Sequence, residues 1–270
     1  MTRTALIAGR GALPGALVAA IHPRPLICAL DGFPPDDLVV DQMFRIERLA
    51  IFLDWLVDQR VTRVVFAGAV QRPKLDPALM DPQSAQILPQ MMAAFQGGDD
   101  ATLRAVIGIF EQAGLPVAGV ADIAPDLVPG PGILVGEPSA VDVRDAARAT
   151  EIVDALGRVD VGQGAVVQQG QCLAVEVLAG SDAMLSSVER LPGSLRPDPA
   201  RGRGLFYKAP KPGQDRRIDL PTLGVDTVHR AAAAGLAGIA WQAGGVICLD
   251  LPAMIVAAKS AGLFLWSRSP

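Results

Sequence analysis

Charged side chains gather in the stretch "KAPKPGQDRRID", which ends at Asp219. Lys208, Lys211, Arg216 and Arg217 could neutralise an anion, and the arginines could hold phosphate oxygens through paired hydrogen bonds. The carboxylate of Asp219 could bind a metal ion or activate water. Phosphoryl chemistry needs both parts: cations that neutralise developing charge, and an acid that fixes the metal or the nucleophile.

The local sequence would determine where these charges point. Pro210 and Pro212 favour extended backbone before them, so the lysines should project from a stiff strand end. We expect Asp219 at the start of a helix that contains Thr222 and His229. The structural alternative is that Asp219 caps this helix or pairs with a neighbouring arginine, an exposed interaction that contributes only ~0–1 kcal/mol.

A glycine-containing turn follows the first apolar run of the chain. Gly9, Arg10 and Gly11 match the first part of a dinucleotide-binding loop, in which glycines let the backbone approach a phosphate at a helix N-terminus. Pro14 replaces the third glycine of that pattern, and Asp31 follows at about the spacing of a ribose-binding acid. We favour anion or nucleotide binding slightly over a plain strand-to-helix turn.

Two further motifs combine glycine or a helix start with polar side chains. Gln163 lies between Gly162 and Gly164, where its amide could bind the edge of a base or sugar or could serve only in a turn. Ser181 and Asp182 begin a predicted helix whose free N–H groups could bind an anion. A plain helix cap by Ser181 is equally consistent with the sequence. Both pairs of alternatives stay open.

The elements that would position these residues alternate between strands and helices in the first half. Continuous apolar runs separated by helices predict a parallel sheet covered on both faces, the doubly wound α/β class. Ligands on such sheets lie beyond the carboxyl ends of the strands, where Gly68 and Ala69 follow the third strand and leave room. The expected strands are residues 4–9, 25–31, 61–68 and 115–120, and the expected helices include residues 13–21, 45–60 and 101–113.

The second half has a different pattern and predicts a second domain. Residues 125–138 are rich in proline and glycine, which marks a boundary. We therefore expect a Rossmann-like N-terminal domain over residues 1–130 and a mixed α+β catalytic domain over residues 135–270.

Two local patterns within the second half are specific enough to place. A capping box at Ser139 and Asp142 should begin a helix that ends with Gly157 as its stop. The run "AVVQQGQCLAVEV" predicts a β-hairpin that turns at Gly170 and Gln171.

Composition limits the class of protein. Half of the 270 residues are apolar, 19% are charged and the net charge is −4, which is typical of a compact globular protein. Nucleic-acid binding needs a basic face, which this balance does not support. Residues 231–249 carry no charge but are mostly alanine and glycine. We expect a helix end, a glycine turn and a buried strand there, rather than a membrane span.

Cysteine and histidine usage narrows the metal chemistry. Cys28, Cys172 and Cys248 form neither a disulfide framework nor a zinc spacing, so we expect buried, reduced cysteines in a cytoplasmic protein. With only two histidines in the chain, any metal should be a hard ion, Mg²⁺ or Mn²⁺, held by oxygen ligands. Asp219 is the first candidate ligand and Glu176 is the second.

Six segments, in order along nearly the whole chain, resemble those of one known family. They are "IAGRGALP", "FAGAVQRP", "GGDDATL", "VDVGQGAVV", "GSDAML" and "KAPKPGQDRRIDLPTLGVDTVHRAAAAGLAGI". The family is that of the two-domain UDP-2,3-diacylglucosamine pyrophosphatases, the lipid A pathway hydrolases of many Gram-negative bacteria that lack the calcineurin-like phosphoesterase for this step. The segment around Asp219 is the most specific of the six.

The resemblance implies Mg²⁺-assisted hydrolysis of the pyrophosphate bond of UDP-2,3-diacylglucosamine, which gives UMP and 2,3-diacylglucosamine 1-phosphate. It also implies that Asp219 is the essential catalytic carboxylate. The implied substrate contacts lie at or beside Gly9, Arg10, Gly11, Ala12, Ala69, Gln163, Gly164, Ser181, Asp182, Lys208, Lys211 and Arg217. This chain departs from the family at two of these positions. Arg10 stands where the family usually has a glycine, and Ala69 stands where it often has an asparagine.

A lipid substrate implies transient contact with a membrane surface, here by a cytoplasmic protein peripheral to the inner membrane of a Gram-negative bacterium. A homodimer is expected from the general frequency of dimers. Two other classes remain. The first loop and Asp31 suggest a nucleotide-dependent oxidoreductase, although Pro14 in place of the third glycine counts against that class. The second alternative is a non-enzymatic module that binds a nucleotide or an anion and would not need Asp219 for catalysis.

Overall fold

The chain folds into two compact units, and each is described by itself. The computed structural model describes residues 2–71, 74–87, 89, 92 and 99–269. The N-terminal unit comprises residues 1–125 and 215–219, and the C-terminal unit comprises residues 126–214 and 220–270. The sequence did not indicate the short return at residues 215–219, which makes Asp219 part of the N-terminal unit.

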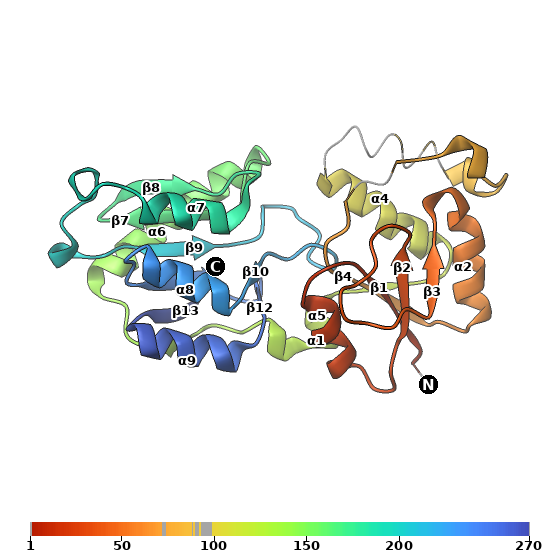
Figure 1. Ribbon diagram of the computed structural model, residues 1–270, viewed down its shortest axis with the longest axis horizontal. Helices are drawn as coiled ribbons and strands as arrows, with labels where there is room; N and C mark the ends of the chain where they lie inside the picture. The colour runs from red at the N-terminus through yellow and green to blue at the C-terminus, as the bar shows by residue number, and fades with distance from the viewer. Residues whose placement is uncertain (1, 72–73, 88, 90–91, 93–98, 270) are drawn as a thin grey trace. The chain divides into compact units, whose positions relative to one another are not determined.

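A five-stranded parallel sheet forms the centre of the N-terminal unit (Figure 1). Its strand order is β3-β2-β1-β4-β5, the order of the first five strands of a doubly wound sheet. The carboxyl ends of β1 and β4 flank the point where the strand order reverses, which is where such sheets bind ligands. The strands are β1 (Thr4–Ala8), β2 (Leu26–Leu30), β3 (Gln42–Phe44), β4 (Arg63–Ala67) and β5 (Val117–Ala118).

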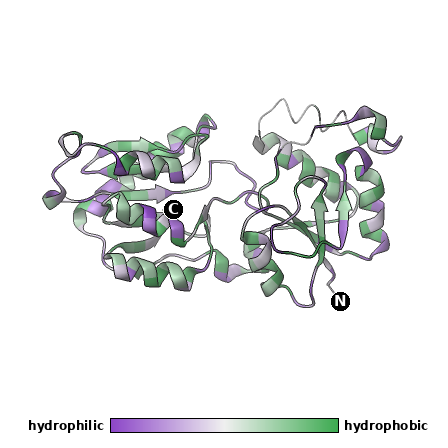
Figure 2. Cartoon of the chain, in the orientation of Figure 1, coloured by the Kyte–Doolittle hydropathy of each residue, from purple (hydrophilic) through white to green (hydrophobic). Residues whose placement is uncertain are grey.

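Helices connect these strands and bury their apolar sides against the sheet. They are α1 (Leu13–Ala20), α2 (Leu49–Asp58), α4 (Asp99–Gln112) and α5 (Val120–Ile123). Figure 2 shows the apolar character of the strands, which is expected because both faces of a parallel sheet are covered. Phe52 stacks on Phe44 with 4.0 Å between ring centroids, and Phe66 meets Phe110 edge-on at 5.1 Å. Strand β3 was not predicted, because three residues without a buried side chain give no strand pattern in the sequence.

A six-stranded mixed sheet forms the centre of the C-terminal unit, in the order β6-β13-β11-β9-β7-β8. β9, β11 and β13 are parallel to one another, while β6, β7 and β8 run antiparallel to their neighbours. The strands are β6 (Gly132–Val135), β7 (Gly164–Gln168), β8 (Gln171–Val175), β9 (Leu205–Lys208), β11 (Gly238–Gln242) and β13 (Phe264–Arg268). This mixed sheet, together with the parallel N-terminal sheet, confirms the predicted fold class.

Helices cover both faces of the mixed sheet. α6 (Ala140–Arg158) packs on one face with Ala165, Leu205 and Tyr207. α7 (Gly180–Glu189), α8 (Val225–Ala233) and α9 (Leu251–Ala261) pack on the other face, with Val166 and Phe206. Successive strand residues point to opposite faces, so β7 and β9 contribute to both cores.

The turn of the β7–β8 hairpin lies one residue earlier than predicted. Gln169 and Gly170 connect the strands, not Gly170 and Gln171, and their φ angles are 52° and 79°. Two positive φ values define the turn type whose twist matches the flanking strands. Asp145 accepts hydrogen bonds from both N–H groups, at 2.8 and 2.7 Å, so a carboxylate from α6 fixes this turn.

Helix α6 begins at the predicted capping box but does not end at Gly157. Ser139 and Asp142 form the box, and the helix continues to Arg158. The left-handed residue after it is Asp160, with φ 57°. Gly157 instead has a packing role, because a Cβ there would lie 2.5 Å from Cδ of Pro212.

The prediction that Asp219 begins a helix was wrong. Thr222 lies in β10 (Thr222–Leu223), which pairs with β12 (Ile247–Cys248) in a separate two-stranded sheet. Only then does α8 begin, with Gly224 as its N-cap, and this helix contains His229. Pairing with a strand 25 positions along the chain decides this segment, and no local pattern reports such pairing.

The uncharged run at residues 231–249 forms the end of α8, then β11, a turn and β12, as predicted. Among the helices that the structure describes, none has both the length and the apolar character needed to cross a bilayer. Cys28 and Cys248 are buried, and burial raises the pKa of each thiol to about 12. Cys172 was expected to be buried but is exposed, because it lies on the edge strand β8.

We predict that Gly157→Ala lowers the stability of the C-terminal unit by about 1–3 kcal/mol, because its methyl group would overlap Pro212. Gly15→Ala is the matched control. Gly15 lies in α1, and a Cβ there meets nothing within 4 Å, so helix propensity should raise stability by about 0.5–1 kcal/mol. Urea unfolding of both variants measures the difference, and shifts of the same sign would contradict the packing role of Gly157.

Candidate functional site

Three polar side chains of the C-terminal unit form a nearly buried cluster. Lys208 Nζ donates a 2.6 Å hydrogen bond to Ser181 Oγ, which donates a 2.5 Å hydrogen bond to Glu176 Oε2. Nζ also lies 3.3 Å from that oxygen, and the side chains of Lys208 and Glu176 are only 9% and 13% exposed. Low exposure strengthens the attraction and makes each charge depend on the other. The structure thus brings three predicted site residues together.

Strand ends and glycines position this cluster. Lys208 ends β9, Glu176 follows β8, and Ser181 lies in the first turn of α7. Gly164 pairs with Lys208 across the sheet, and a Cβ on Gly164 would lie 2.8 Å from Glu176 Oε2. A Cβ on Gly162 would lie 1.9 Å from the backbone oxygen of Glu176. Both glycines are therefore explained by the close packing of the chain around Glu176.

Gln163 lies between these glycines and has an unsatisfied oxygen. Its backbone carbonyl accepts a 3.0 Å hydrogen bond from the N–H of Ala209. Its side-chain Oε1 is buried and has no hydrogen-bond partner among the described residues. A buried amide oxygen without a partner is costly, so a donor group of a ligand or a water molecule would be favourable there. Contact between Gln163 and a base or sugar stays a prediction.

This cluster has the chemistry of an anion-binding site. α7 begins without a side-chain cap, and the N-terminus of a helix carries partial positive charge and free N–H groups. Lys208 adds a full positive charge beside that N-terminus, and Ser181 can donate or accept a hydrogen bond. Glu176 balances the charge, so a bound phosphate would share Lys208 with it.

Two further predicted residues, Lys211 and Asp182, are engaged in ion pairs at the surface. Lys211 Nζ donates to Asp160 Oδ1, and Arg230 Nε lies 3.3 Å from Asp182 Oδ1. Asp160 and Asp182 are 54% and 61% exposed, so water screens both pairs and they can exchange partners at small cost. Their contacts with a substrate stay predictions.

Two loops of the N-terminal unit meet beyond the carboxyl ends of β1 and β4. Arg10 and Ala69 exchange backbone hydrogen bonds of 3.0 and 2.9 Å. The backbones approach so closely that a Cβ on Gly9 would lie 2.5 Å from the oxygen of Ala69, and one on Gly68 would lie 2.6 Å from the carbonyl carbon of Gly9. This approach requires glycine at both positions whether or not a ligand binds.

The N–H groups of the glycine turn already have partners. The N–H of Gly9 donates to the oxygen of Ala67 at 2.8 Å, and that of Gly11 donates to Asp36 Oδ2 at 2.8 Å. Ala12 is the N-cap of α1 and offers no side-chain cap. The Asp36 carboxylate occupies the position that a phosphate would take on Gly11, so a phosphate bound there must displace it.

Asp31, the acid at the expected spacing for a ribose, is bound by Arg45 Nη1 at 2.6 Å. Both residues line a cavity of about 430 Å³ beside β3 and α2. Its apolar and aromatic lining consists of Met43, Phe44, Ile51, Phe52 and Trp55.

The segment around Asp219 is attached to the N-terminal unit through Arg217 and Ile218. Arg217 Nη1 donates a 2.6 Å hydrogen bond to Glu111 Oε1 of α4. Ile218 packs against the N-terminal core. A Cβ on Gly119 would lie 3.2 Å from the Cα of Arg217, so the two backbones are close. These contacts fix the chain next to Asp219, whose side chain is partly exposed.

Arg217 also binds Asp215 through two parallel hydrogen bonds, of 2.9 and 2.7 Å. The hydrogen bonds from Arg217 lower the pKa of Asp215, and the same pairing raises the pKa of Arg217. The bidentate geometry expected for a phosphate is thus made to a carboxylate, and the substrate contact of Arg217 stays a prediction. The charge cluster in the sequence signalled Asp215, but nothing signalled Glu111, which lies 106 positions from Arg217.

The described part of the chain brings no three histidine, cysteine, aspartate or glutamate side chains together as a metal-binding group. Glu176 fits the predicted metal role poorly, because the Lys208 ammonium lies 3.3 Å from its carboxylate. Asp219 fits better, since Mg²⁺ is commonly bound by one or two carboxylates and by substrate phosphates rather than by an all-protein cage.

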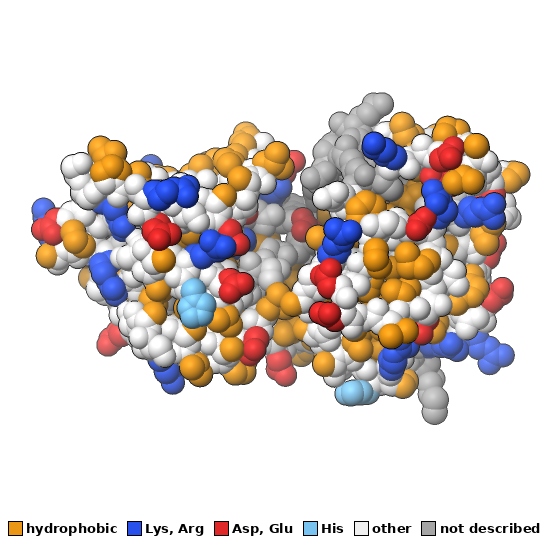
Figure 3. All heavy atoms as spheres, viewed as in Figure 1, with side chains coloured by type: hydrophobic (Ala, Val, Ile, Leu, Met, Phe, Trp, Pro, Cys, Tyr) orange, Lys and Arg blue, Asp and Glu red, His pale blue; other side chains and the backbone are white. Residues whose placement is uncertain are grey.

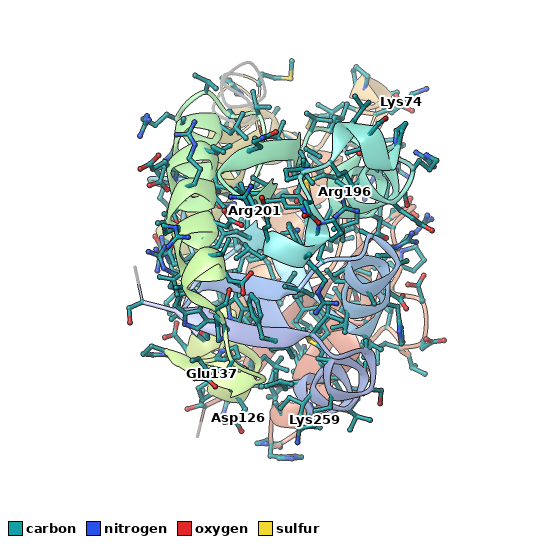
Figure 4. The ribbon with its side chains drawn as sticks, turned by 90° about the vertical axis from the view of Figure 1, so that its left-hand side faces the viewer. Lys74, Asp126, Glu137, Arg196, Arg201 and Lys259 are labelled. Carbon is teal, nitrogen blue, oxygen red and sulfur yellow. The ribbon has the colours of Figure 1, made fainter. Side chains whose placement is uncertain are left out.

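A cavity of about 750 Å³ lies at the other edge of the C-terminal sheet, beside the first residues of β9, β11 and β13. Glu137, Arg201 and Lys259 are among its lining residues and are labelled in Figure 4. Lys208 lies at the opposite, carboxyl end of β9, so this cavity contains none of the predicted site residues. Positive and negative side chains are also interspersed on the face of this unit that Figure 3 shows.

These features define a two-unit α/β protein with a Lys208–Ser181–Glu176 cluster at the carboxyl end of β9 in its C-terminal sheet. The family model of the LpxI N-terminal domain matches residues 3–127, and that of the LpxI C-terminal domain matches residues 131–266. The chain is 37% identical over 282 residues to the UDP-2,3-diacylglucosamine pyrophosphatase LpxI of Caulobacter vibrioides, an alignment that covers 100% of this chain and 99% of that protein. The chain therefore belongs to the LpxI family, as its resemblance implied.

We predict that Asp215→Asn loosens the segment around Asp219 at neutral pH and has less effect in acid. The lowered pKa of Asp215 means that its contribution is complete above the usual carboxyl pKa of ~4 and is lost as the pH falls through the lower folded-state pKa. Arg217 is 38% exposed, so we expect only about 0.5–1 kcal/mol. Protection of the Ile218 amide against hydrogen exchange measures this, and a pH-independent difference would contradict it.

We predict that Lys208→Met lowers the free energy of unfolding by about 2–4 kcal/mol, because Glu176 then keeps a nearly buried charge without its cation. Adding Glu176→Gln should recover part of the loss, and Lys259→Met, at an exposed lysine, should change stability by less than ~0.5 kcal/mol. Denaturant unfolding of the native protein, of Lys208→Met, of Glu176→Gln, of the double variant and of Lys259→Met tests the coupling, and strictly additive losses from the two changes in the ion pair would count against it.

Proposed function

We propose that this protein hydrolyses the pyrophosphate bond of UDP-2,3-diacylglucosamine in lipid A synthesis. The products would be UMP and 2,3-diacylglucosamine 1-phosphate. The observation that carries the proposal is the full-length relationship to the Caulobacter vibrioides protein of that name, at 37% identity. Residues of both units also support it.

The C-terminal cluster supplies groups suited to a phosphate. Lys208 is held at the end of β9, beside the N-terminus of α7, so its charge and the helix N–H groups converge on one place. A charge fixed in a weakly solvated position stabilises developing negative charge more strongly than a mobile surface lysine. The Ser181 hydroxyl can donate a hydrogen bond to a phosphate oxygen, while Lys208 stays paired with Glu176. Gln163 offers a buried acceptor for a sugar hydroxyl or a base N–H.

Asp219 is the carboxylate that we assign to catalysis. Its backbone is fixed by the packing of Ile218 and by the Arg217–Glu111 ion pair, so a partly exposed acid is presented on an anchored segment. Two roles follow from its chemistry: it can hold a metal ion, or it can accept a proton from the attacking water. Arg217 would add positive charge beside it, once its carboxylate partners share it with the substrate.

A Mg²⁺ ion, or Mn²⁺ in its place, fits the oxygen chemistry of Asp219 and of the two substrate phosphates. When bound, such an ion neutralises charge on the phosphates and on the leaving group. The residues of the chain would do the rest: Lys208 and the N-terminus of α7 would orient a phosphate, and Asp219 would hold the ion or accept a proton from water.

The lipid substrate and product lead us to propose transient contact with a membrane surface, and we also propose a homodimer and a cytoplasmic location. The oxidoreductase alternative is weaker. Asp31 is bound to Arg45, and the N–H of Gly11 is bound to Asp36, so two groups that a dinucleotide would need are already engaged.

The decisive test is release of UMP from UDP-2,3-diacylglucosamine with Mg²⁺ and with EDTA. We predict that Asp219→Ala lowers the rate at least ~100-fold, because it removes the group that positions metal or water. Asp226→Ala is the control: Asp226 is an exposed acid in the first turn of α8, so its loss should leave the rate within about twofold.

Four outcomes would contradict all or part of the proposal. A native protein that releases no UMP excludes the reaction, and an active Asp219→Ala variant excludes the role of Asp219. Full activity in EDTA excludes only the metal. Turnover of NADH or NADPH by the native protein would favour the oxidoreductase instead.

A further inference from the structure

Four exposed aliphatic side chains border the Lys208–Ser181–Glu176 cluster, and we call them the apolar rim. They are Val159, Val161, Val177 and Leu178, with exposed fractions of 67%, 42%, 49% and 104%. Single exposed aliphatic residues are common on protein surfaces. These four, in contrast, are not single, because they come from two loops that adjoin one another beside a nearly buried ion pair.

The two loops meet at Glu176. Val161 precedes Gly162, where a Cβ would lie 1.9 Å from the backbone oxygen of Glu176, and Val177 follows Glu176 directly. Val159 and Val161 flank Asp160, whose carboxylate binds Lys211. Residues of the apolar rim are therefore adjacent in sequence to Glu176 and Asp160, the acids that pair with Lys208 and Lys211.

Leu178 occupies the tip of a tight turn. The N–H of Gly180 donates a 2.8 Å hydrogen bond to the oxygen of Val177, which closes a four-residue turn with Leu178 as its second residue. Turns usually place glycine, proline, asparagine, aspartate or serine at their tips, because these residues suit the backbone or tolerate water. The Leu178 side chain is fully exposed, so its burial contributes nothing to the free energy of folding.

We propose that the apolar rim, in which Leu178 is the most exposed residue, binds the fatty acyl chains of the lipid substrate. This inference rests on the proposed function, in which the substrate carries two acyl chains on the sugar next to its phosphates. Such a molecule needs a cationic, hydrogen-bonding centre with apolar surface at its border, which is the arrangement of Lys208, Ser181 and the apolar rim. Burial of one leucine side chain against an acyl chain is enough to change affinity about tenfold or more.

The test compares substrates that differ only in acyl length. We expect Leu178→Gln to raise KM about tenfold for UDP-2,3-diacylglucosamine with eight-carbon chains, and to leave KM nearly unchanged with two-carbon acetyl groups. kcat should stay within about twofold for both substrates, because Leu178 lies outside the ionic cluster. Leu178→Met, which keeps the apolar surface, should retain the native preference for the longer chains.

Leu195→Gln is the matched control. Leu195 is also an exposed leucine, at 66%, but it precedes Arg196, which binds Gln168 and Ala234 at the other edge of the sheet. This variant should show native KM values for both substrates. Unchanged unfolding midpoints for all variants, expected for fully exposed positions, exclude a general loss of structure.

Several outcomes overturn the inference. An equal rise in KM for both substrates would place Leu178 against the sugar or phosphates, and no rise would remove it from the site. A change of acyl preference with Ile51→Gln alone would assign the chains to the 430 Å³ cavity of the N-terminal unit. Weaker binding of Leu178→Gln to phosphatidylglycerol vesicles, with native acyl preference, would assign the rim to a membrane surface.

The design separates this inference from the proposed function. A native protein that hydrolyses neither substrate refutes both. A native protein that hydrolyses both substrates, with an acyl preference that Leu178→Gln does not change, refutes only the role of the apolar rim.

Discussion

The pairing of Lys208 with Glu176 is the constraint on which the candidate site depends. Two charges with about a tenth of their surface exposed must stay close, since either one alone would be poorly solvated. Ser181 joins them by hydrogen bonds to both, which fixes the start of α7 against the end of β9. Glu176 also requires glycine at positions 162 and 164, because its backbone oxygen lies where a Cβ on residue 162 would be and its carboxylate lies beside that of residue 164.

In the N-terminal unit, the constraint is the close approach of two backbone segments, the loops after β1 and β4. Gly9 and Gly68 let the loops after β1 and β4 form a pair of hydrogen bonds through Arg10 and Ala69. A glycine turn after a first strand is commonly interpreted as a phosphate-binding loop. Here the contact between two loops already accounts for both glycines, so their presence is weak evidence for a nucleotide. The Asp36 carboxylate on Gly11 shows that the turn still attracts an anion.

The cationic side chains of Lys208, Lys211 and Arg217, which we expect to bind phosphates, are paired with carboxylates of the protein itself. Arg217 is bound to Asp215 and Glu111, Lys211 to Asp160, and Lys208 to Glu176. Such pairs hold long, flexible side chains in place and lessen their mutual repulsion. A phosphate that binds one of these cations must therefore compete with the carboxylate that already holds it.

The sequence by itself determined the class of both sheets, the capping box of α6 and the family, because these depend on local periodicity, local capping and ordered motifs. It also identified Lys208, Ser181 and Glu176 as candidates without showing that they meet. Only the tertiary structure decided that meeting, since the three residues come from separate elements of one sheet edge. The same holds for Asp219, which the sequence assigned to a helix start and to the second domain. Pairing of β10 with β12 and the attachment of Arg217 to Glu111 are long-range contacts, and local sequence patterns carry no record of them.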